Sequence, residues 1–165
     1  MAAAAAITIS AAWLAILAGV AKLLRPSEAV EAMRAVRLPA GAALVRAGAL
    51  VECGLGVAVL ASPSWIARVL LAGSYVALGA FVVVSMRTSP DVGCGCFGGR
   101  GPTSHVRHLA ITGACALGAA ASALHRGAAP MATVHWTSPR GAVALVLGAA
   151  SAVLAATYAG RERVA

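Results

Sequence analysis

The chain has 165 residues, of which 61% are hydrophobic and only 11% are charged. Soluble globular domains carry about 25% charged residues, so this composition excludes an ordinary soluble domain. The net charge of +8 is compatible with nucleic-acid binding, but the arginines lie singly or in pairs at the ends of apolar runs, which argues against a nucleic-acid partner. Alanine and glycine dominate these runs, as in helices that pack closely in lipid. We therefore predict an integral membrane protein.

The first apolar run covers residues 7–24 and is broken only by small polar residues before Lys22. A helix of this length approaches the ~30 Å thickness of a hydrocarbon core. A cleaved signal peptide is the alternative, but no positive charge precedes the apolar part, so we interpret the run as a retained transmembrane helix. We expect Lys22 to extend its ammonium group to the membrane interface.

Residues 26–39 predict a short amphipathic helix that lies on the membrane surface. Acidic residues, Glu28 and Glu31, lie near its start, and basic residues, Arg34 and Arg37, lie near its end. This distribution complements the helix dipole. The charges then form a solvated face over an apolar face turned to the membrane.

The second span, residues 41–61, contains two charged residues. Arg46 lies near its start and can reach the interface, whereas Glu52 lies near its middle. A charged residue at the centre of a span costs about 2.5–3.5 kcal/mol on insertion scales, so it usually faces a partner or a watery cavity. Two interpretations of Glu52 stay open: a purely structural partner, or a redox or proton-handling role.

Three further apolar runs complete the predicted bundle, at residues 66–86, 106–124 and 142–159. No internal repeat, run of charges or linker divides the chain. The sequence therefore predicts one all-α domain over residues 1–165, with about five transmembrane helices and one short interfacial helix.

The basic residues are distributed unevenly between the two sides of such a bundle. With five spans, the larger group lies on one side and consists of Lys22, Arg25, Arg34, Arg37, Arg87, Arg100, Arg107, Arg161 and Arg163. The smaller group lies on the other side and consists of Arg68, Arg126 and Arg140. The positive-inside rule then predicts a multi-pass protein of the cell membrane with its amino terminus outside and its carboxyl terminus in the cytoplasm.

A glycine-rich break between the third and fourth spans contains two of the four cysteines, in the sequence Asp91-Val-Gly-Cys94-Gly-Cys96-Phe-Gly-Gly. Two cysteines separated by a single glycine, Gly95, can close a small, strained disulfide ring, and strained disulfides are the labile or catalytic ones. Glycine removes the steric penalty that a side chain would add to this turn. We therefore predict that Cys94 and Cys96 are redox-active.

The residues around this cysteine pair favour thiol chemistry. Phe97 and Gly98 follow Gly95 in the loop, and Arg107 and His108 begin the next span. Positive charge near a thiol increases its reactive thiolate fraction. We therefore expect these five residues to support the loop.

The other two cysteines, Cys53 and Cys115, lie inside predicted spans. Each is either an inert filler of apolar space or a redox partner at mid-membrane depth. Zinc binding is the main alternative role for the cysteines. Structural zinc sites, however, usually contain C-x₂₋₄-C pairs, and the one-residue spacer between Cys94 and Cys96 does not match. We therefore expect no metal.

The motif Cys94-Gly-Cys-Phe-Gly98 resembles the signature of the MauE family, membrane proteins of methylamine utilisation that are related to the DoxX-like helical fold. The segments Ala18-Gly-Val-Ala-Lys22-Leu and Val51-Glu52-Cys-Gly-Leu resemble the first two helices of that family. Arg107-His108 stands where the family pattern has an Arg-Asn pair, and this position departs from it. The likeness extends to about residue 125.

The resemblance implies a DoxX-like four-helix core with one additional helix. It also implies thiol–disulfide exchange with a thioredoxin-like partner, during maturation of the disulfide-rich small subunit of methylamine dehydrogenase. The disulfide-containing client of this chain stays open. If that partner is periplasmic, a cytoplasmic cysteine loop cannot meet it directly, which leaves electron transfer across the bundle, an inverted topology or a misassigned span as alternatives.

Our leading hypothesis is a membrane thiol–disulfide oxidoreductase. Cys94 and Cys96 exchange electrons with the thioredoxin-like protein, Cys53 and Cys115 accept them within the membrane, and Glu52 gives or takes a proton. A membrane quinone is an alternative acceptor, although no residue pattern specifies its pocket. The competing hypothesis is a non-catalytic scaffold or assembly factor with structural cysteines. A small-molecule transporter is a third class, supported only by the charged residues of the second span.

Overall fold

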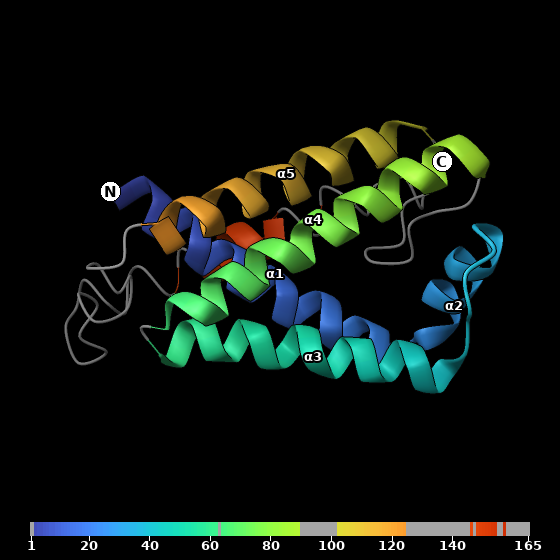
Figure 1. The fold of residues 1–165 in the computed structure, drawn as a ribbon, viewed down its shortest axis with the longest axis horizontal. Helices are drawn as coiled ribbons and strands as arrows, with labels where there is room; N and C mark the ends of the chain where they lie inside the picture. Colours follow the sequence, from blue (N-terminus) through green and yellow to red (C-terminus); the bar gives the residue numbers. More distant parts are fainter. Residues whose placement is uncertain are drawn as a thin grey trace.

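The computed structural model describes residues 2–62, 64–89, 102–124, 146, 148–154 and 157 (Figure 1). The described part is all-α, as predicted. Its main helices, in chain order, are α1 (Ala2–Leu24), α2 (Pro26–Ala35), α3 (Ala42–Ala61), α4 (Trp65–Thr88) and α5 (Pro102–Leu124). The described residues after position 145 are helical as well, within the predicted span 142–159.

The first four predicted spans lie within about five residues of the bounds of α1, α3, α4 and α5, and most of the fifth lies outside the described residues. Three of the described helices are long and apolar enough to cross a membrane: α1 from Ala6, α3 and α4. α5 is of similar length but is not among these three. Its first turns contain His105, Arg107 and His108, which lower its mean hydropathy. These lengths and compositions fit a helical membrane bundle.

The predicted interfacial helix ends earlier than expected, at Ala35 rather than near residue 39. The reason is a helix-terminating turn in which Arg37 adopts a left-handed backbone conformation, with φ of 59°. The N–H of Arg37 donates to the Arg34 carbonyl at 2.9 Å, and the N–H of Leu38 donates to the Met33 carbonyl at 3.0 Å. This is the Schellman arrangement, with arginine at the position that glycine usually occupies.

Two helix pairs form the bundle. α1 packs along α3 and α4 packs along α5, while α1 also contacts α5 and α3 contacts α4 (Figure 1). α3 and α4 are joined through Ser62 and Ser64 at one end and diverge toward the other, where α2 lies (Figure 1). We call this second end the α2 end. Ser89, directly after α4, donates from its hydroxyl to the Ala35 carbonyl of α2 at 3.2 Å. The carboxyl-terminal end of α4 therefore lies at the α2 end.

Glycines allow α1 and α3 to approach closely at two points. A Cβ atom added to Gly56 of α3 would lie 2.6 Å from the Ala12 carbonyl oxygen of α1. A Cβ atom added to Gly19 of α1 would lie 2.7 Å from the Ala49 carbonyl oxygen of α3. Any side chain at these positions would force the helices apart, so this seam depends on small residues, as expected for helices packed in lipid.

Candidate functional site

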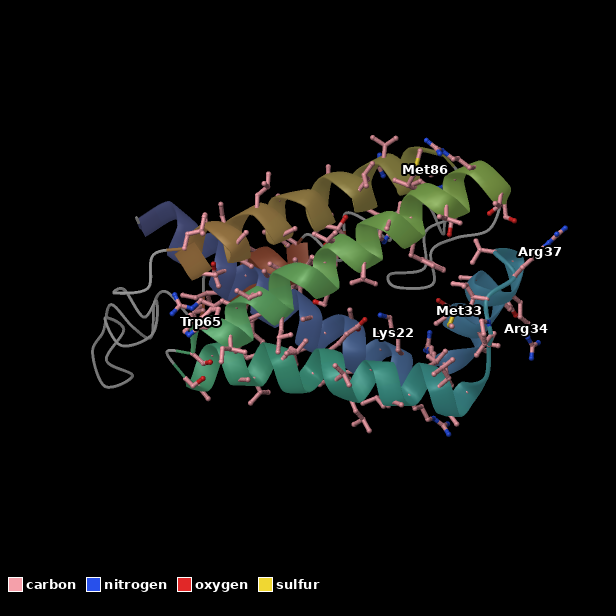
Figure 2. The ribbon with its side chains drawn as sticks, viewed as in Figure 1. Lys22, Met33, Arg34, Arg37, Trp65 and Met86 are labelled. Carbon is pink, nitrogen blue, oxygen red and sulfur yellow. The ribbon has the colours of Figure 1, made fainter. Side chains whose placement is uncertain are left out.

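A buried ion pair joins α1 to α3. Lys22 Nζ donates to the two carboxylate oxygens of Glu52 at 2.6 and 2.7 Å. The side chains are only 9% and 16% exposed, respectively. In Figure 2 Lys22 lies between helices, whereas Arg34 of α2 and Arg37 just after it point away from the bundle.

The expectation that Lys22 extends to the interface is therefore wrong. The physical reason is the position of Glu52, which lies opposite Lys22 on the neighbouring helix. A carboxylate left alone in an apolar bundle carries a large desolvation penalty, and a bidentate ammonium partner offsets much of it. One of the two interpretations of Glu52 required a structural partner, and that partner is Lys22.

The Cys53 thiol lies directly beside this pair, against α1. Its Sγ donates to the Ile16 carbonyl of α1 at 3.6 Å. Gly19 leaves the space that the thiol occupies, because a Cβ atom there would lie 2.5 Å from Sγ. Ile16, Gly19 and Lys22 are spaced three residues apart and so lie on one face of α1. The Ile16 carbonyl, the space at Gly19 and the Lys22 ammonium therefore all face Glu52 and Cys53 of α3.

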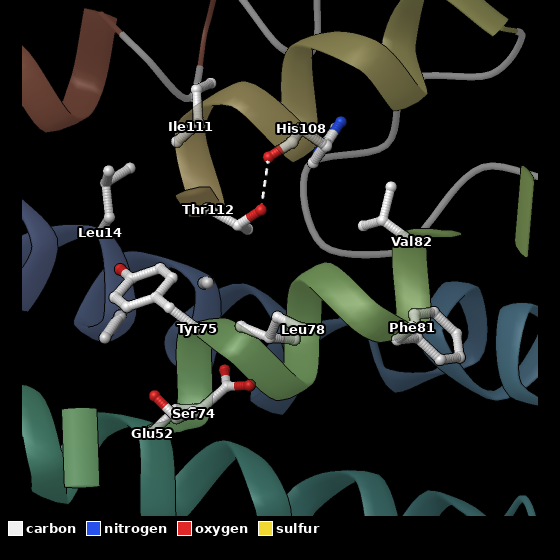
Figure 3. Close-up of a pocket in the computed structure, with 12 residues that line it drawn as sticks. Leu14, Glu52, Ser74, Tyr75, Leu78, Phe81, Val82, His108, Ile111 and Thr112 are labelled. Atoms are coloured by element: carbon white, nitrogen blue, oxygen red, sulfur yellow. Dashed lines mark hydrogen bonds between the residues drawn. The ribbon is translucent and has the colours of Figure 1, made fainter. Parts of the chain in front are cut away.

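A small cavity adjoins the ion pair between the two helix pairs (Figure 3). Its volume is about 30 Å³. Most of its lining is apolar, and the polar residues that line it are Glu52, Ser74, Tyr75, His108 and Thr112. A single water requires about 10–15 Å³ by this kind of measure, so the cavity has room for about two waters.

The hydroxyl groups around the cavity donate to backbone carbonyls. Tyr75 donates to Ala11 at 2.6 Å, Ser74 to Leu71 at 2.7 Å, and Thr112 to His108 at 2.9 Å, the last drawn as a dashed line in Figure 3. The hydroxyl protons are therefore engaged within the bundle. Glu52 and His108 contribute the ionisable groups that line the cavity from α3 and α5.

Cys115 has a different environment from that of Cys53. It is 5% exposed and lies in the apolar core with Ile9, Tyr75 and Ala119. Both thiols are free, so no disulfide joins them. Cys53 is therefore half-buried beside an ion pair, whereas Cys115 is buried in the core.

The predicted redox loop, with Cys94, Gly95, Cys96, Phe97 and Gly98, lies outside the described residues. His108, which we expected to support that loop, is 3% exposed and lines the cavity instead of the surface. Arg107 beside it is partly exposed. Their influence on the loop thiols stays a prediction.

Sequence reasoning found Glu52 and Cys53 but missed their partner Lys22 and the cavity residues Tyr75 and Thr112. The sequence feature that indicates the ion pair is a single lysine inside the first span and a single glutamate inside the second. These two helices pack antiparallel. Among the described residues, no group of three or more histidine, cysteine, aspartate or glutamate side chains converges as a metal site would require.

Comparison with known families identifies a match. The family described as methylamine utilisation protein MauE matches residues 1–126. This range includes the ion pair, the residues that line the cavity and all four cysteines. No curated protein and no solved structure matches the chain significantly.

Proposed function

The chain belongs to the MauE family of methylamine utilisation proteins, and on this premise we propose that it is a membrane thiol–disulfide exchange protein that supports disulfide formation in a partner. The observation that carries the proposal is the free Cys53 thiol beside the buried Lys22–Glu52 pair. An ionisable pair inside a membrane bundle is costly and marks functional sites more often than structural ones. Replacing such a pair by apolar residues is often neutral or stabilising, so stability alone does not explain it.

The chemistry balances as disulfide exchange. A disulfide between Cys94 and Cys96 is reduced to two thiols while two thiols of the client are oxidised to a disulfide. Two electrons and two protons move from client to loop through a mixed disulfide. A thioredoxin-like protein in its disulfide form takes them in turn and restores the loop. The resemblance noted from the sequence implies a corresponding client, the disulfide-rich small subunit of methylamine dehydrogenase, and the family name refers to methylamine utilisation.

Cys53 is the better candidate for an internal redox partner than Cys115. It is half-buried, adjoins charged groups and faces the Gly19 gap, whereas Cys115 is buried in the core. Glu52 supplies a proton acceptor next to the thiol. The proposal therefore assigns exchange to Cys94, Cys96 and Cys53, and packing to Cys115.

The proposal includes an orientation in the cell membrane. At the α2 end, the exposed basic residues are Arg25, Arg34, Arg37, Arg46 and Arg87. Arg68, toward the opposite end, is only 1% exposed. Positive charge favours the cytoplasmic side, so the α2 end faces the cytoplasm and the amino terminus faces outward. Labelling Cys94 and Cys96 in intact cells with a membrane-impermeant reagent tests this: labelling from outside would invert the orientation.

Serine substitution of the loop cysteines tests the function. C94S and C96S variants are expected to abolish client oxidation and to leave protein levels in the membrane unchanged. One of the two should also accumulate a trappable mixed disulfide, because exchange stops halfway. C115A is the matched control and should support full client oxidation. If both serine variants support full client oxidation, the exchange proposal is wrong.

A non-catalytic scaffold is the second candidate function. It is favoured by one observation, that Lys22 engages both carboxylate oxygens of Glu52 and ties α1 to α3. In a scaffold the loop cysteines only stabilise the fold. C94S and C96S would then lower the amount of folded protein, whereas in an exchange protein they block electron transfer without changing that amount.

A further inference from the structure

Three groups meet where α1 crosses the middle of α3: the Lys22 ammonium, the Glu52 carboxylate and the Cys53 thiol. The ammonium lies on the carboxylate at 2.6 Å. A long side chain on a helix leans toward the helix amino terminus, so the Lys22 stem extends back over the turn that contains Gly19. The Cys53 sulfur occupies the gap at Gly19, with no side chain on that residue to separate them.

The charge of this group is balanced with the proton on either acid. With Cys53 as a thiol, the ammonium is balanced by the Glu52 carboxylate. With the proton on Glu52, the same ammonium is balanced by the Cys53 thiolate. Both arrangements have zero net charge, whereas a thiolate formed beside an ionised Glu52 would bury an excess negative charge, which is costly in an apolar bundle.

We propose that Lys22 is a shared cation, paired with Glu52 when Cys53 is a thiol and with Cys53 when Glu52 carries the proton, so that protonation of Glu52 switches Cys53 to its reactive form. The inference rests on the proposed function only in giving Cys53 an exchange role. The proposed switch binds a proton at Glu52 and regulates the Cys53 thiol.

Each step of the switch balances. One proton passes from the Cys53 thiol to the Glu52 carboxylate, and no electrons are transferred. The thiolate attacks a disulfide sulfur of the partner, so that one sulfur–sulfur bond forms and another breaks. The departing thiolate takes the proton back from Glu52, which then pairs again with Lys22.

Glu52 also lines the cavity from α3, and the titratable residues that face it there from α4 and α5 are Tyr75 and His108.

The rate of Cys53 alkylation tests the switch. The protein is prepared in membranes with Cys53 as its only cysteine, through C94S, C96S and C115S, and is treated with N-ethylmaleimide at pH 7.5. E52Q is expected to raise the second-order rate about tenfold or more, because Lys22 is then left to stabilise the thiolate. Adding K22M to E52Q should remove the increase. E31Q on the exposed side of α2 is the matched charge control and should leave the rate unchanged.

Two results overturn the proposal: a rate for E52Q no higher than that of the parent, or an equal increase in the K22M/E52Q double variant. If E52Q does not accumulate, K22M/E52Q is compared with the parent directly. The double variant has no cation to stabilise the thiolate, so its rate should fall below that of the parent. A rate equal to that of the parent also refutes the shared cation. The assay contains neither loop cysteines nor client, so its failure is distinct from failure of the exchange function.

Discussion

The α1/α3 pair and the α4/α5 pair contain similar types of residue in different arrangements. Each has, among the described residues, one cysteine and one buried lysine or arginine. In α1/α3 the basic residue is Lys22, which engages a carboxylate beside a half-buried thiol. In α4/α5 it is Arg68, which donates from Nη1 to the Ser122 backbone carbonyl at 2.7 Å, while Cys115 lies in the apolar core.

The difference lies in what balances the positive charge. The last carbonyls of a helix have no intrahelical partner, and a guanidinium that binds one stabilises the helix end. Arg68 therefore connects α4 to the end of α5 through a backbone carbonyl. Lys22 instead connects α1 to α3 through a side-chain carboxylate. Under the proposed function, the first pair holds the reacting thiol and the second supports the fold.

The largest expected effect follows from breaking the ion pair on one side. K22M leaves Glu52 buried without its ammonium, and we expect the free energy of unfolding to fall by about 3–5 kcal/mol. K22M/E52Q removes both charges and should recover most of that loss. Denaturant titration in detergent measures both values. R46M, an exposed position on α3, is the control and should shift stability by less than about 0.5 kcal/mol.

The corresponding change in the other pair is R68M. It removes a buried, charged donor from the Ser122 carbonyl, and we expect a loss of about 1.5–3 kcal/mol. Because Arg68 does not contact the thiol site, the Cys53 alkylation rate should stay at the parent value. A large change in that rate would contradict the division between the two pairs.

The Gly19 gap can be filled directly. G19A places a methyl group against the Cys53 sulfur and the Ala49 carbonyl, and we expect overpacking to cost about 1–3 kcal/mol and to change the Cys53 alkylation rate. G54A is a matched control, since it adds the same methyl group next to Cys53 where nothing lies within 4 Å. Alanine is the better helix former by about 1 kcal/mol, so G54A should be neutral or slightly stabilising. Equal losses in both variants would show that the gap has no special role.

The smallest effect is expected at Cys115. C115A removes one buried sulfur, and the loss of unfolding free energy should be about 1 kcal/mol. Its thiol should react with N-ethylmaleimide more slowly than that of Cys53, because it is only 5% exposed. Mass spectrometry of labelled peptides measures both rates in one sample. Faster labelling of Cys115 would reverse the assignment of the two thiols.

The helices were predictable from the sequence because membrane spans depend on local composition. α1 extends further toward the amino terminus than the predicted start at residue 7, because its first residues are alanines, which favour helix. Glu52 was recognisable as unusual from its depth in a span. Its partner was not, because the pairing depends on the register between α1 and α3, and that register is fixed by contacts at Gly19 and Gly56. The cavity depends on how two helix pairs diverge, and no local pattern encodes this.

The most direct test of the account is the redox state of the cysteines in cells. Acid quenching followed by alkylation and mass spectrometry reports each cysteine separately. With the client expressed, we expect Cys94 and Cys96 to alternate between a disulfide and two thiols as the thioredoxin-like partner is supplied or removed, while Cys115 stays a thiol throughout. If Cys94 and Cys96 stay thiols under every condition, the chain does not transfer electrons through them, and the central claim is contradicted.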